Sequence, residues 1–392
     1  MTQFDVCVRG AGVVGRTLAL LLARERLRVG LLAPDTTRAT AADVRAYALN
    51  GASRALLESL RAWPDEADAT AVLAMRVHGD AGGAVTFSAA AERVPALAWI
   101  VDVPALEARL TEAVRFQPLI ERVDDVDGAA LTVVCEGRAS STRHEFGVDF
   151  EVTPYPQRAI ATRLRCEQPH RQTAYQWFDD NEVLALLPLG GPHGDTVAAV
   201  WSVASERAAP LLALSDDEFA ERIGQASRQA LGRLTLTSAR ADWPLQLARA
   251  NRWVGQHAGT SWALAGDAAH TVHPLSGQGL NLGLADAAAL ARALQRRDYW
   301  RSAGDLRVLR GYERARKQEL LQMSLLTDGL QQLFSLNAGP WKTLRNWGMN
   351  GFEHSGPFKH WAARQAMGAA AGRGAARAGR RGGRNAARYP DR

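Results

Sequence analysis

The sequence predicts an α/β fold: a Rossmann-like domain with helices on a parallel sheet, an inserted lobe of antiparallel sheet, and a helical C-terminal region. Two glycine loops, each joining a short apolar strand to a helix, predict the first domain, and alternating β segments between them predict the lobe. The chain has 392 residues, more than one hydrophobic core usually supports, so a second lobe is expected.

The first glycine loop follows the opening strand. "FDVCVR", residues 4–9, is a short apolar run that leads through "GAGVVG" into "RTLALLLARERL", which has helical periodicity, and then into the apolar "RVGLLA". Gly10, Gly12 and Gly15 have the spacing of the dinucleotide fingerprint. In that fingerprint the glycines permit a tight turn, a close approach of the pyrophosphate and close packing of helix on sheet. The segment therefore predicts a nucleotide site.

From about Phe150 the sequence changes to β-rich alternation. Four segments predict strands of an antiparallel sheet: "QRAIATRLRCE", "TAYQWFDD", "EVLALLPLG" and "TVAAVWSVA". The helix that follows is predicted to begin after Ser215, which forms a capping box with Glu218. The tryptophans of this lobe are expected either to pack its core or to line an apolar pocket; they include Trp177, Trp201 and Trp243.

The second glycine loop lies near the other end of the predicted lobe. "WALAG", residues 262–266, predicts a buried strand, "GDAAHTVHPLSGQGLNLG" is the loop, and "NLGLADAAALARALQRR" predicts a helix. The start of such a helix presents unpaired N–H groups and about half a positive charge, which favour an anion. Because this loop lies about 250 residues after the first, we expect one extended cofactor to contact both.

Composition and charge exclude several classes of protein for this sequence. Three scattered cysteines, Cys7, Cys135 and Cys166, form neither a disulfide framework nor a metal spacing, so we expect buried thiols in a reducing cytosol. Residues 368–392 contain seven arginines and one acid and thus carry the whole formal charge of +6, so we expect no nucleic-acid partner. The first residues show neither the basic segment of a signal peptide nor an apolar run long enough to cross a bilayer, so neither is expected there. We expect a cytoplasmic protein, with peripheral contact to the inner membrane of a bacterium as the alternative.

Several motifs together resemble those of the FAD-dependent aromatic hydroxylases, and within them the ubiquinone-biosynthesis hydroxylases. "GAGVVG" resembles the ADP-binding motif, "GDAAH" the ribityl-binding motif, and "HPLSGQGLNLGLADA" the signature that separates the ubiquinone group. The resemblance extends over about residues 4–367 and includes "DVRAYALN" and "TPYPQRAIATRLRCEQPH". It implies a FAD-dependent monooxygenase that hydroxylates the aromatic ring of a polyprenylated phenol in ubiquinone biosynthesis.

The resemblance also implies site residues. It assigns the pyrophosphate to the first loop, a place beside the flavin to Arg45, the ribityl chain to Asp267, and the isoalloxazine edge to residues 274–281. The candidate cofactor-binding residues are Gly10, Gly12, Val13, Gly15, Asp35, Arg45, Gly266, Asp267, Pro274, Gly277, Gln278, Gly279, Leu280 and Asn281. His273 and Pro274 are the candidate catalytic residues, His273 through proton traffic near the substrate. No third ligand accompanies His270 and His273, so no metal is predicted and His270 is interpreted as structural.

Two departures from the family's pattern are visible. The second strand ends at Ala33 where an acid normally binds the ribose, so either Asp35 takes this role or the contact is missing. In "CEGRASSTR", residues 135–143, Glu136 replaces the usual aspartate of a motif related to nicotinamide and pyrophosphate contacts. Three other positions of that motif match: Gly137, Ser140 and Arg143.

The implied reaction uses NAD(P)H to reduce FAD and O2 to form a C4a-hydroperoxyflavin, which transfers oxygen to the phenol ring. Two alternatives stay open: a flavin-dependent reductase or dehydrogenase of a prenylated lipid, which needs no O2, and a weakly active scaffold subunit of the quinone-biosynthesis assembly. Each buried CH2 of a polyprenyl tail is worth about 0.8 kcal/mol. A membrane surface or a multi-enzyme ubiquinone-biosynthesis complex is therefore expected to deliver the substrate.

The domain boundaries follow from these segments. Residues 1–75, 100–150 and 255–340 are expected to form a discontinuous FAD-binding domain, and residues 76–99 and 151–254 the substrate-binding β-sheet lobe. A C-terminal helix is expected over 341–367, where it either closes the flavin domain or contacts a membrane. Residues 368–392 are expected to form a basic disordered tail, with attraction to anionic lipid as an alternative role.

Overall fold

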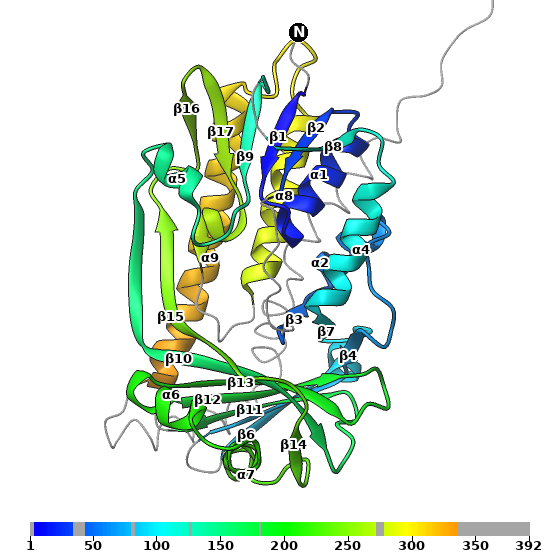
Figure 1. The fold of residues 1–392 in the computed structure, drawn as a ribbon, viewed down its shortest axis with the longest axis vertical. Coiled ribbons are helices and arrows are strands. Elements are labelled where there is room, and N and C mark those ends of the chain that lie inside the picture. The colour runs from blue at the N-terminus through cyan, green and yellow to red at the C-terminus, as the bar shows by residue number, and fades with distance from the viewer. Residues whose placement is uncertain are drawn as a thin grey trace, which may run out of the picture.

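The computed structural model describes residues 4–33, 44–79, 83–124, 128–179, 182–271 and 278–335, with side chains as far as residue 322. Figure 1 shows a body of helices and parallel strands standing on a broad sheet that crosses the base of the molecule. The α/β class predicted from the sequence is confirmed. The predicted helix over 341–367 and the basic tail over 368–392 lie outside the described residues.

A parallel sheet forms the centre of the upper body. Within the described ranges it has six strands in the order β16–β17–β9–β1–β2–β8, and the neighbours are parallel except for the β16–β17 hairpin. The strands are β1 Val6–Arg9, β2 Val29–Leu32, β8 Ile120–Val123, β9 Leu131–Val134, β16 Val254–His257 and β17 Thr260–Leu264. The strands β1 and β9 consist almost entirely of buried apolar residues, as expected of a parallel sheet covered on both faces.

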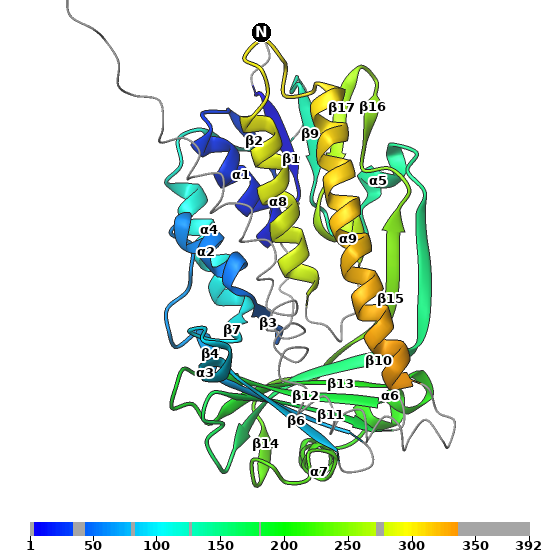
Figure 2. The ribbon, with the colours of Figure 1, turned by 180° about the vertical axis from the view of Figure 1, so that it is seen from behind.

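Four helices cover this sheet, and Figure 2 shows two of them, α8 and α9, side by side on its rear face. The helices are α1 Val13–Arg24, α4 Val103–Arg115, α8 Gly279–Gln295 and α9 Leu306–Ser335. Helix α1 packs against both α4 and α8. The first helix of the chain therefore lies beside a helix that begins some 265 residues later.

The sheet at the base contains the β segments predicted for the second lobe. Its order in the described chain is β18–β15–β10–β13–β12–β11–β5–β6, with β14 also paired to β10, and β11 and β5 form its parallel pair. The strands are β5 Ala74–His78, β6 Ala84–Ser88, β10 Phe150–Cys166, β11 Thr173–Asp179, β12 Glu182–Leu189, β13 Thr196–Ala204, β14 Leu234–Leu236, β15 Ala241–Ala250 and β18 His270–Thr271.

One face of this sheet packs on two helices, α6 Ser205–Leu212 and α7 Asp216–Ala226. Trp177 and Trp201 belong to that core, and the Trp201 ring lies 6.2 Å from the ring of Phe219 on α7. The predicted capping box is confirmed, because Ser215 and Glu218 exchange side-chain to backbone hydrogen bonds at the start of α7. Trp243 is half-buried on β15.

Smaller elements fill the space between the two sheets. The strands β3 Ala46–Leu49, β4 Ala69–Val72 and β7 Ala98–Asp102 form a three-stranded sheet in the order β3–β7–β4, and its Val72 and Ile100 pack on Ala198 of the large sheet. The remaining elements are α2 Gly51–Ser59, α3 Ala89–Glu92, α5 Ser141–Glu145 and the 3-10 turn η1 Gly266–Ala268. The predicted domain boundaries stay predictions.

The three cysteines are free and buried, as predicted. Burial raises the pKa of Cys166 to about 12 and raises the pKa of Cys135 further still. In the part of the chain that the structure describes, no helix combines the length and the apolar composition needed to cross a bilayer.

Candidate functional site

The first glycine loop closes tightly against its neighbours. Gly10 has φ +106°, and a Cβ there would lie 2.5 Å from the carbonyl oxygen of Cys135. A Cβ on Gly15 would lie 1.8 Å from the carbonyl oxygen of Gly10, so the two positions require glycine. Gly12 is different: it precedes helix α1 and a Cβ there would meet nothing within 4 Å. The open side of the loop is thus the N-terminus of α1, where unpaired N–H groups attract an anion.

The two described ends of the second glycine loop lie directly against α1. Gly266, with φ +65°, and Gly283 both face the side chain of Val14, and a Cβ on Gly283 would lie 2.7 Å from Val14 Cγ2. Gly279 begins helix α8 and has open space where a Cβ would lie. The helices α1 and α8, which begin some 265 residues apart in the chain, are therefore packed together near their N-termini.

Asp267 follows the turn at Gly266 and has an exposed side chain. Burial of its surroundings nevertheless raises the pKa of this carboxyl, against the opposing effects of His270, Arg138 and Arg45. Among the cationic side chains that act on this carboxyl, Arg45 has the smallest effect.

A side chain of the large sheet holds the backbone of Arg45 in place. The Arg45 guanidinium lies over the ring of Tyr47, 6.0 Å from the ring centroid, and Nη1 is 3.4 Å from the Tyr47 hydroxyl. Arg163 of β10 donates to the carbonyl oxygens of Val44 and Arg45 and forms an ion pair of 2.6 Å with Asp102. These contacts fix the segment that carries Arg45 between the two sheets.

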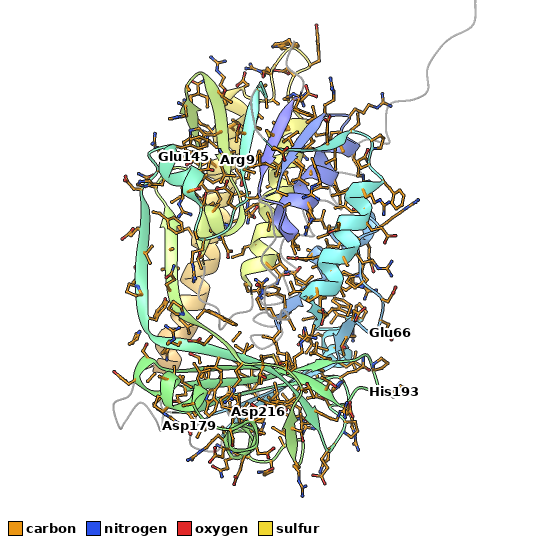
Figure 3. All side chains as sticks on the ribbon, in the orientation of Figure 1. Arg9, Glu66, Glu145, Asp179, His193 and Asp216 are labelled. Atoms are coloured by element: carbon orange, nitrogen blue, oxygen red, sulfur yellow. The ribbon has the colours of Figure 1, made fainter. Side chains whose placement is uncertain are left out.

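The segment 135–143, in which Glu136 replaces the usual aspartate, connects three parts of the site. The Glu136 carboxylate accepts hydrogen bonds of 2.7 Å from Ser140 and Thr142 at the start of α5, and it pairs with Arg9 at 3.2 Å. Arg9 ends β1 and also lies beside Glu145 of α5, as Figure 3 shows. The longer acid therefore joins the end of the first strand to α5.

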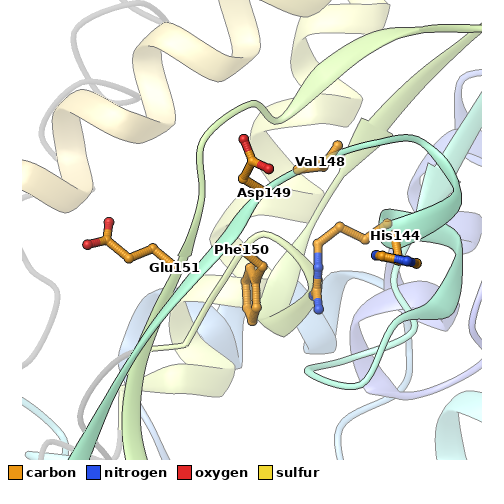
Figure 4. Close-up of a pocket in the computed structure, with 6 residues that line it drawn as sticks. His144, Val148, Asp149, Phe150 and Glu151 are labelled. Carbon is orange, nitrogen blue, oxygen red and sulfur yellow. The ribbon is translucent and has the colours of Figure 1, made fainter.

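Arg143 extends from α5 to the second loop. Its Nη1 donates to the carbonyl oxygen of Ala268 at 3.1 Å, next to Asp267. The guanidinium also lies 3.5 Å from the ring centroid of Phe150 and lines a cavity of about 420 Å³ at the start of β10 (Figure 4). Asp149 and Glu151 line the same cavity, so Arg143 connects it to the second loop.

Asn281 makes contacts that sequence reasoning did not foresee. Its Nδ2 donates to the carbonyl oxygen of Ala48 at 2.8 Å, and its Oδ1 accepts from Asn50 N at 3.0 Å and from Ser53 Oγ at 2.7 Å. This buried side chain therefore ties α8 to β3 and α2. Leu280 packs in the cluster that contains Leu57 and Leu284. Cofactor contact by either residue stays a prediction.

Four of the predicted residues lie outside the described part of the chain. They are Asp35, His273, Pro274 and Gly277. Their roles in binding or catalysis stay predictions, as does the role of Gln278, which directly precedes α8. The described candidates belong to two neighbouring parts of the fold. Gly10, Gly12, Val13 and Gly15 form the turn into α1, and Gly266, next to Asp267, faces Val14 of that helix, as does Gly283 of the α8 helix that begins at Gly279.

A buried carboxylate behind the second loop was also missed. Asp286 of α8 is fully buried; its Oδ2 accepts from the backbone N of Gly266 at 2.9 Å and from His270 Nε2 at 2.7 Å, and its Oδ1 accepts from Arg316 Nε at 2.7 Å. Burial acts to raise the pKa of Asp286, but the nearby His270 and Arg316 hold that pKa below its ordinary value. The signal in the sequence was an acid on an otherwise apolar helix, "GLNLGLADAAAL".

The residues present fit a long cofactor with a central pyrophosphate. Two open helix N-termini, at Gly12 and Gly279, suit negative charge, and the exposed carboxylate of Asp267 suits the hydroxyl groups of a sugar or ribityl chain. The site lies at the carboxyl ends of parallel strands β1 and β17, the edge at which such sheets bind ligands.

Comparison with known proteins shows which families and structures this chain is similar to. The family model described as "FAD binding domain" matches residues 119–323. The chain is 30% identical to ubiquinone hydroxylase UbiL of Rhodospirillum rubrum, over 93% of this chain and 89% of that protein. It is 28% identical to 3-demethoxyubiquinol 3-hydroxylase of Escherichia coli, over 93% and 98%. The crystal structure of PqsL from Pseudomonas aeruginosa shares the fold with a TM-score of 0.71 and 24% identity, over 89% and 99% of the chains.

Fold and site together define a FAD-dependent monooxygenase, with FAD as its cofactor. The family is also shown by the length and identity of the sequence matches. The chain belongs to the ubiquinone-biosynthesis hydroxylase family of the FAD-dependent aromatic hydroxylases, as its motifs predicted.

Proposed function

We propose that this protein hydroxylates the aromatic ring of a polyprenylated phenol in ubiquinone biosynthesis, with NAD(P)H as reductant and O2 as co-substrate. The observation that carries the proposal is the pair of glycine loops packed on Val14 in a chain of this family. When bound, FAD supplies the redox chemistry and the activation of O2. The protein has to hold the cofactor, place the ring and exclude water.

Each part of the site has a role in this proposal. The N-terminus of α1 at Gly12 holds the pyrophosphate, and Asp267 accepts hydrogen bonds from the ribityl hydroxyls. The N–H groups and dipole at the N-terminus of α8, at Gly279, would stabilise negative charge on a flavin ring bound there. Arg45 stands beside the flavin, held by Arg163.

The substrate is proposed to lie on the face of the large sheet that is turned away from α7. By strand register this face carries small apolar residues in neighbouring strands, with Ala161 opposite Val200 and Val200 opposite Ala185. Ala185 and Val200 keep part of their surface accessible although they lie in the interior of the sheet. Small side chains leave room for an aromatic ring and part of an apolar tail.

The polyprenyl tail determines where the protein meets its substrate. Since each buried CH2 contributes about 0.8 kcal/mol, such a substrate stays in a lipid phase or on a protein rather than in water. We therefore propose that the protein meets it at the cytoplasmic surface of the bacterial inner membrane or within a biosynthetic complex.

A labelling experiment tests the reaction. Purified protein with FAD, given NAD(P)H, a prenylated phenol and ¹⁸O2, is expected to yield a product that carries one labelled oxygen on the ring. Deletion of the gene in a quinone-making bacterium is expected to accumulate a precursor that lacks one ring hydroxyl, detected by mass spectrometry. Nicotinamide oxidation without label in the product would favour the reductase alternative, and an intact quinone pool would contradict the pathway.

Replacement of Asp267 by asparagine separates the effect of this carboxylate on FAD binding from its effect on the stability of the apoprotein. A hydrogen bond to a charged acceptor contributes about 1.5–3 kcal/mol, so FAD affinity is expected to fall about tenfold to a hundredfold. Because the pKa of Asp267 is raised in the folded protein, its charge opposes folding at neutral pH, and the apoprotein variant is expected to be slightly more stable. Flavin fluorescence titration and thermal unfolding of the apoprotein measure the two effects.

The matched control for this variant is Asp216→Asn on α7. Asp216 pairs with Arg240 at 3.0 Å on the exposed side of the large sheet. Its replacement is expected to leave FAD affinity unchanged. Equal affinity of the wild-type and Asp267→Asn proteins for FAD would remove Asp267 from the cofactor site.

A further inference from the structure

We propose that Asp286 is a positioning residue of the flavin site: it fixes the turn at Gly266 from behind and so sets where Asp267 points. This inference rests on the proposed cofactor site at that turn. Asp286 lies on α8, seven residues after the Gly279 that begins the helix. One rigid helix would then hold both the ribityl-binding turn and the N-terminus that faces the flavin ring.

The hydrogen bonds of Asp286 are directed at the protein. One carboxylate oxygen holds the backbone N–H of Gly266 and the ring N–H of His270, and the other holds the Nε–H of Arg316. The side chain is fully buried behind the turn. Asp286 therefore acts through Gly266 on the neighbouring Asp267.

His270 forms the second attachment of the loop. Its ring stacks on Trp253 with 5.0 Å between the ring centroids, while Nε2 donates to Asp286 at 2.7 Å. His270 begins β18, which pairs with β15 through Arg249 and Ala248. The loop is thus attached to Asp286 on both sides of Asp267, through Gly266 before it and His270 after it.

Helix α9 supplies the charge that makes a buried carboxylate tolerable. Arg316 is 2% exposed, donates to Asp286 and reaches the carbonyl oxygen of Leu282 at 3.4 Å. Its neighbours on α9 hold the same region: Tyr312 donates to the carbonyl oxygen of Leu264, and Glu313 accepts from the backbone N of Trp253. Side chains of α9 therefore support the second loop from behind.

Two substitutions of His270 distinguish positioning by hydrogen bonds from simple packing. His270→Gln keeps an N–H that reaches Asp286 but loses the ring on Trp253, whereas His270→Phe keeps the ring and loses the N–H. We expect His270→Gln to bind FAD with an affinity close to that of the wild type. His270→Phe is expected to bind about tenfold or more weakly, because a hydrogen bond to a charged group is lost.

The readouts are FAD affinity by fluorescence titration of the apoprotein, the visible circular dichroism of the bound flavin, and the melting temperature with and without FAD. Positioning predicts an altered dichroism band and a smaller FAD-induced rise in melting temperature for His270→Phe and for Asp286→Asn. Arg301→Gln is the control, because Arg301 pairs with Asp298 and Asp305 before α9 and away from the second loop. It is expected to change none of these quantities.

Stronger FAD binding by His270→Phe than by His270→Gln would overturn the proposal in favour of packing. Equal melting-temperature losses in apoprotein and holoprotein, with an unchanged dichroism band, would do the same. If Asp286→Asn fails to fold, the two His270 variants still test the proposal. None of these readouts uses hydroxylation, so a protein that binds FAD as expected but inserts no oxygen contradicts only the proposed function.

Discussion

Replacement of Gly15 by alanine is expected to yield protein that purifies without flavin. The new Cβ would lie 1.8 Å from the carbonyl oxygen of Gly10 and 3.4 Å from Cys135 Cβ. Backbone atoms cannot give way as a flexible side chain does, so α1 has to move off β1 and its N-terminus leaves the pyrophosphate position. The measurement is the flavin absorbance that remains after desalting in excess FAD.

Gly311→Ala is the matched control for this prediction. Gly311 lies on α9, and a Cβ there would meet nothing within 4 Å. Alanine in a helix interior is more favourable than glycine by about 0.5–1 kcal/mol, so this variant is expected to keep its flavin and to melt at a slightly higher temperature. Retention of flavin by Gly15→Ala would show that the first loop tolerates a side chain at that position.

Replacement of Arg316 by methionine is expected to lower the free energy of unfolding by about 3–5 kcal/mol at neutral pH, because it leaves the buried Asp286 without its arginine partner. Equilibrium unfolding in urea measures this change. The control is Arg109→Gln, which breaks a pair of 2.6 Å with Asp65 at the surface and is expected to cost about 0–1 kcal/mol. Similar losses of stability in the two variants would mean that burial does not increase the contribution of the Arg316–Asp286 pair to the free energy of unfolding.

The same variant is expected to change the response to acid. The pKa of Asp286 is lowered in the folded protein, so its ionised form stabilises the fold above the ordinary carboxyl pKa of 3.8, and that stability is lost as the pH falls through the folded-state pKa. Without Arg316 one cause of the lowering is gone, so the folded-state pKa rises towards 3.8 and the stability lost on acidification is expected to be smaller. Unfolding measured between neutral and acidic pH follows the shift.

Local patterns were sufficient to predict much of the fold. The glycine spacing, the alternating β segments and the Ser215 capping box each depend on residues near one another in the chain, and the structure confirms the elements that they predicted. The three-stranded sheet β3–β7–β4 was not predicted, because its strands are only four or five residues long and pair across some 30 to 50 residues of chain.

The supporting contacts of the site could not be read from the sequence. Asn281 bonds to Ser53 across 228 residues of chain, and Arg316 reaches Asp286 across 30. Hydrogen-bond partners at such separations are determined by tertiary packing, and no local sequence pattern predicts them. The exchange of aspartate for Glu136 was visible, but its meaning required the position of Arg9 and the first turn of α5.

The contact of Val14 with Gly266 and Gly283 has a consequence for how the protein is made. The first half of the site leaves the ribosome about 250 residues ahead of the second. At about 5–20 residues per second, this is a delay on the order of tens of seconds. During that interval α1 has no α8 to rest on, and the nascent chain has no complete place for FAD. Loading of the cofactor thus belongs to the last stage of synthesis or follows it.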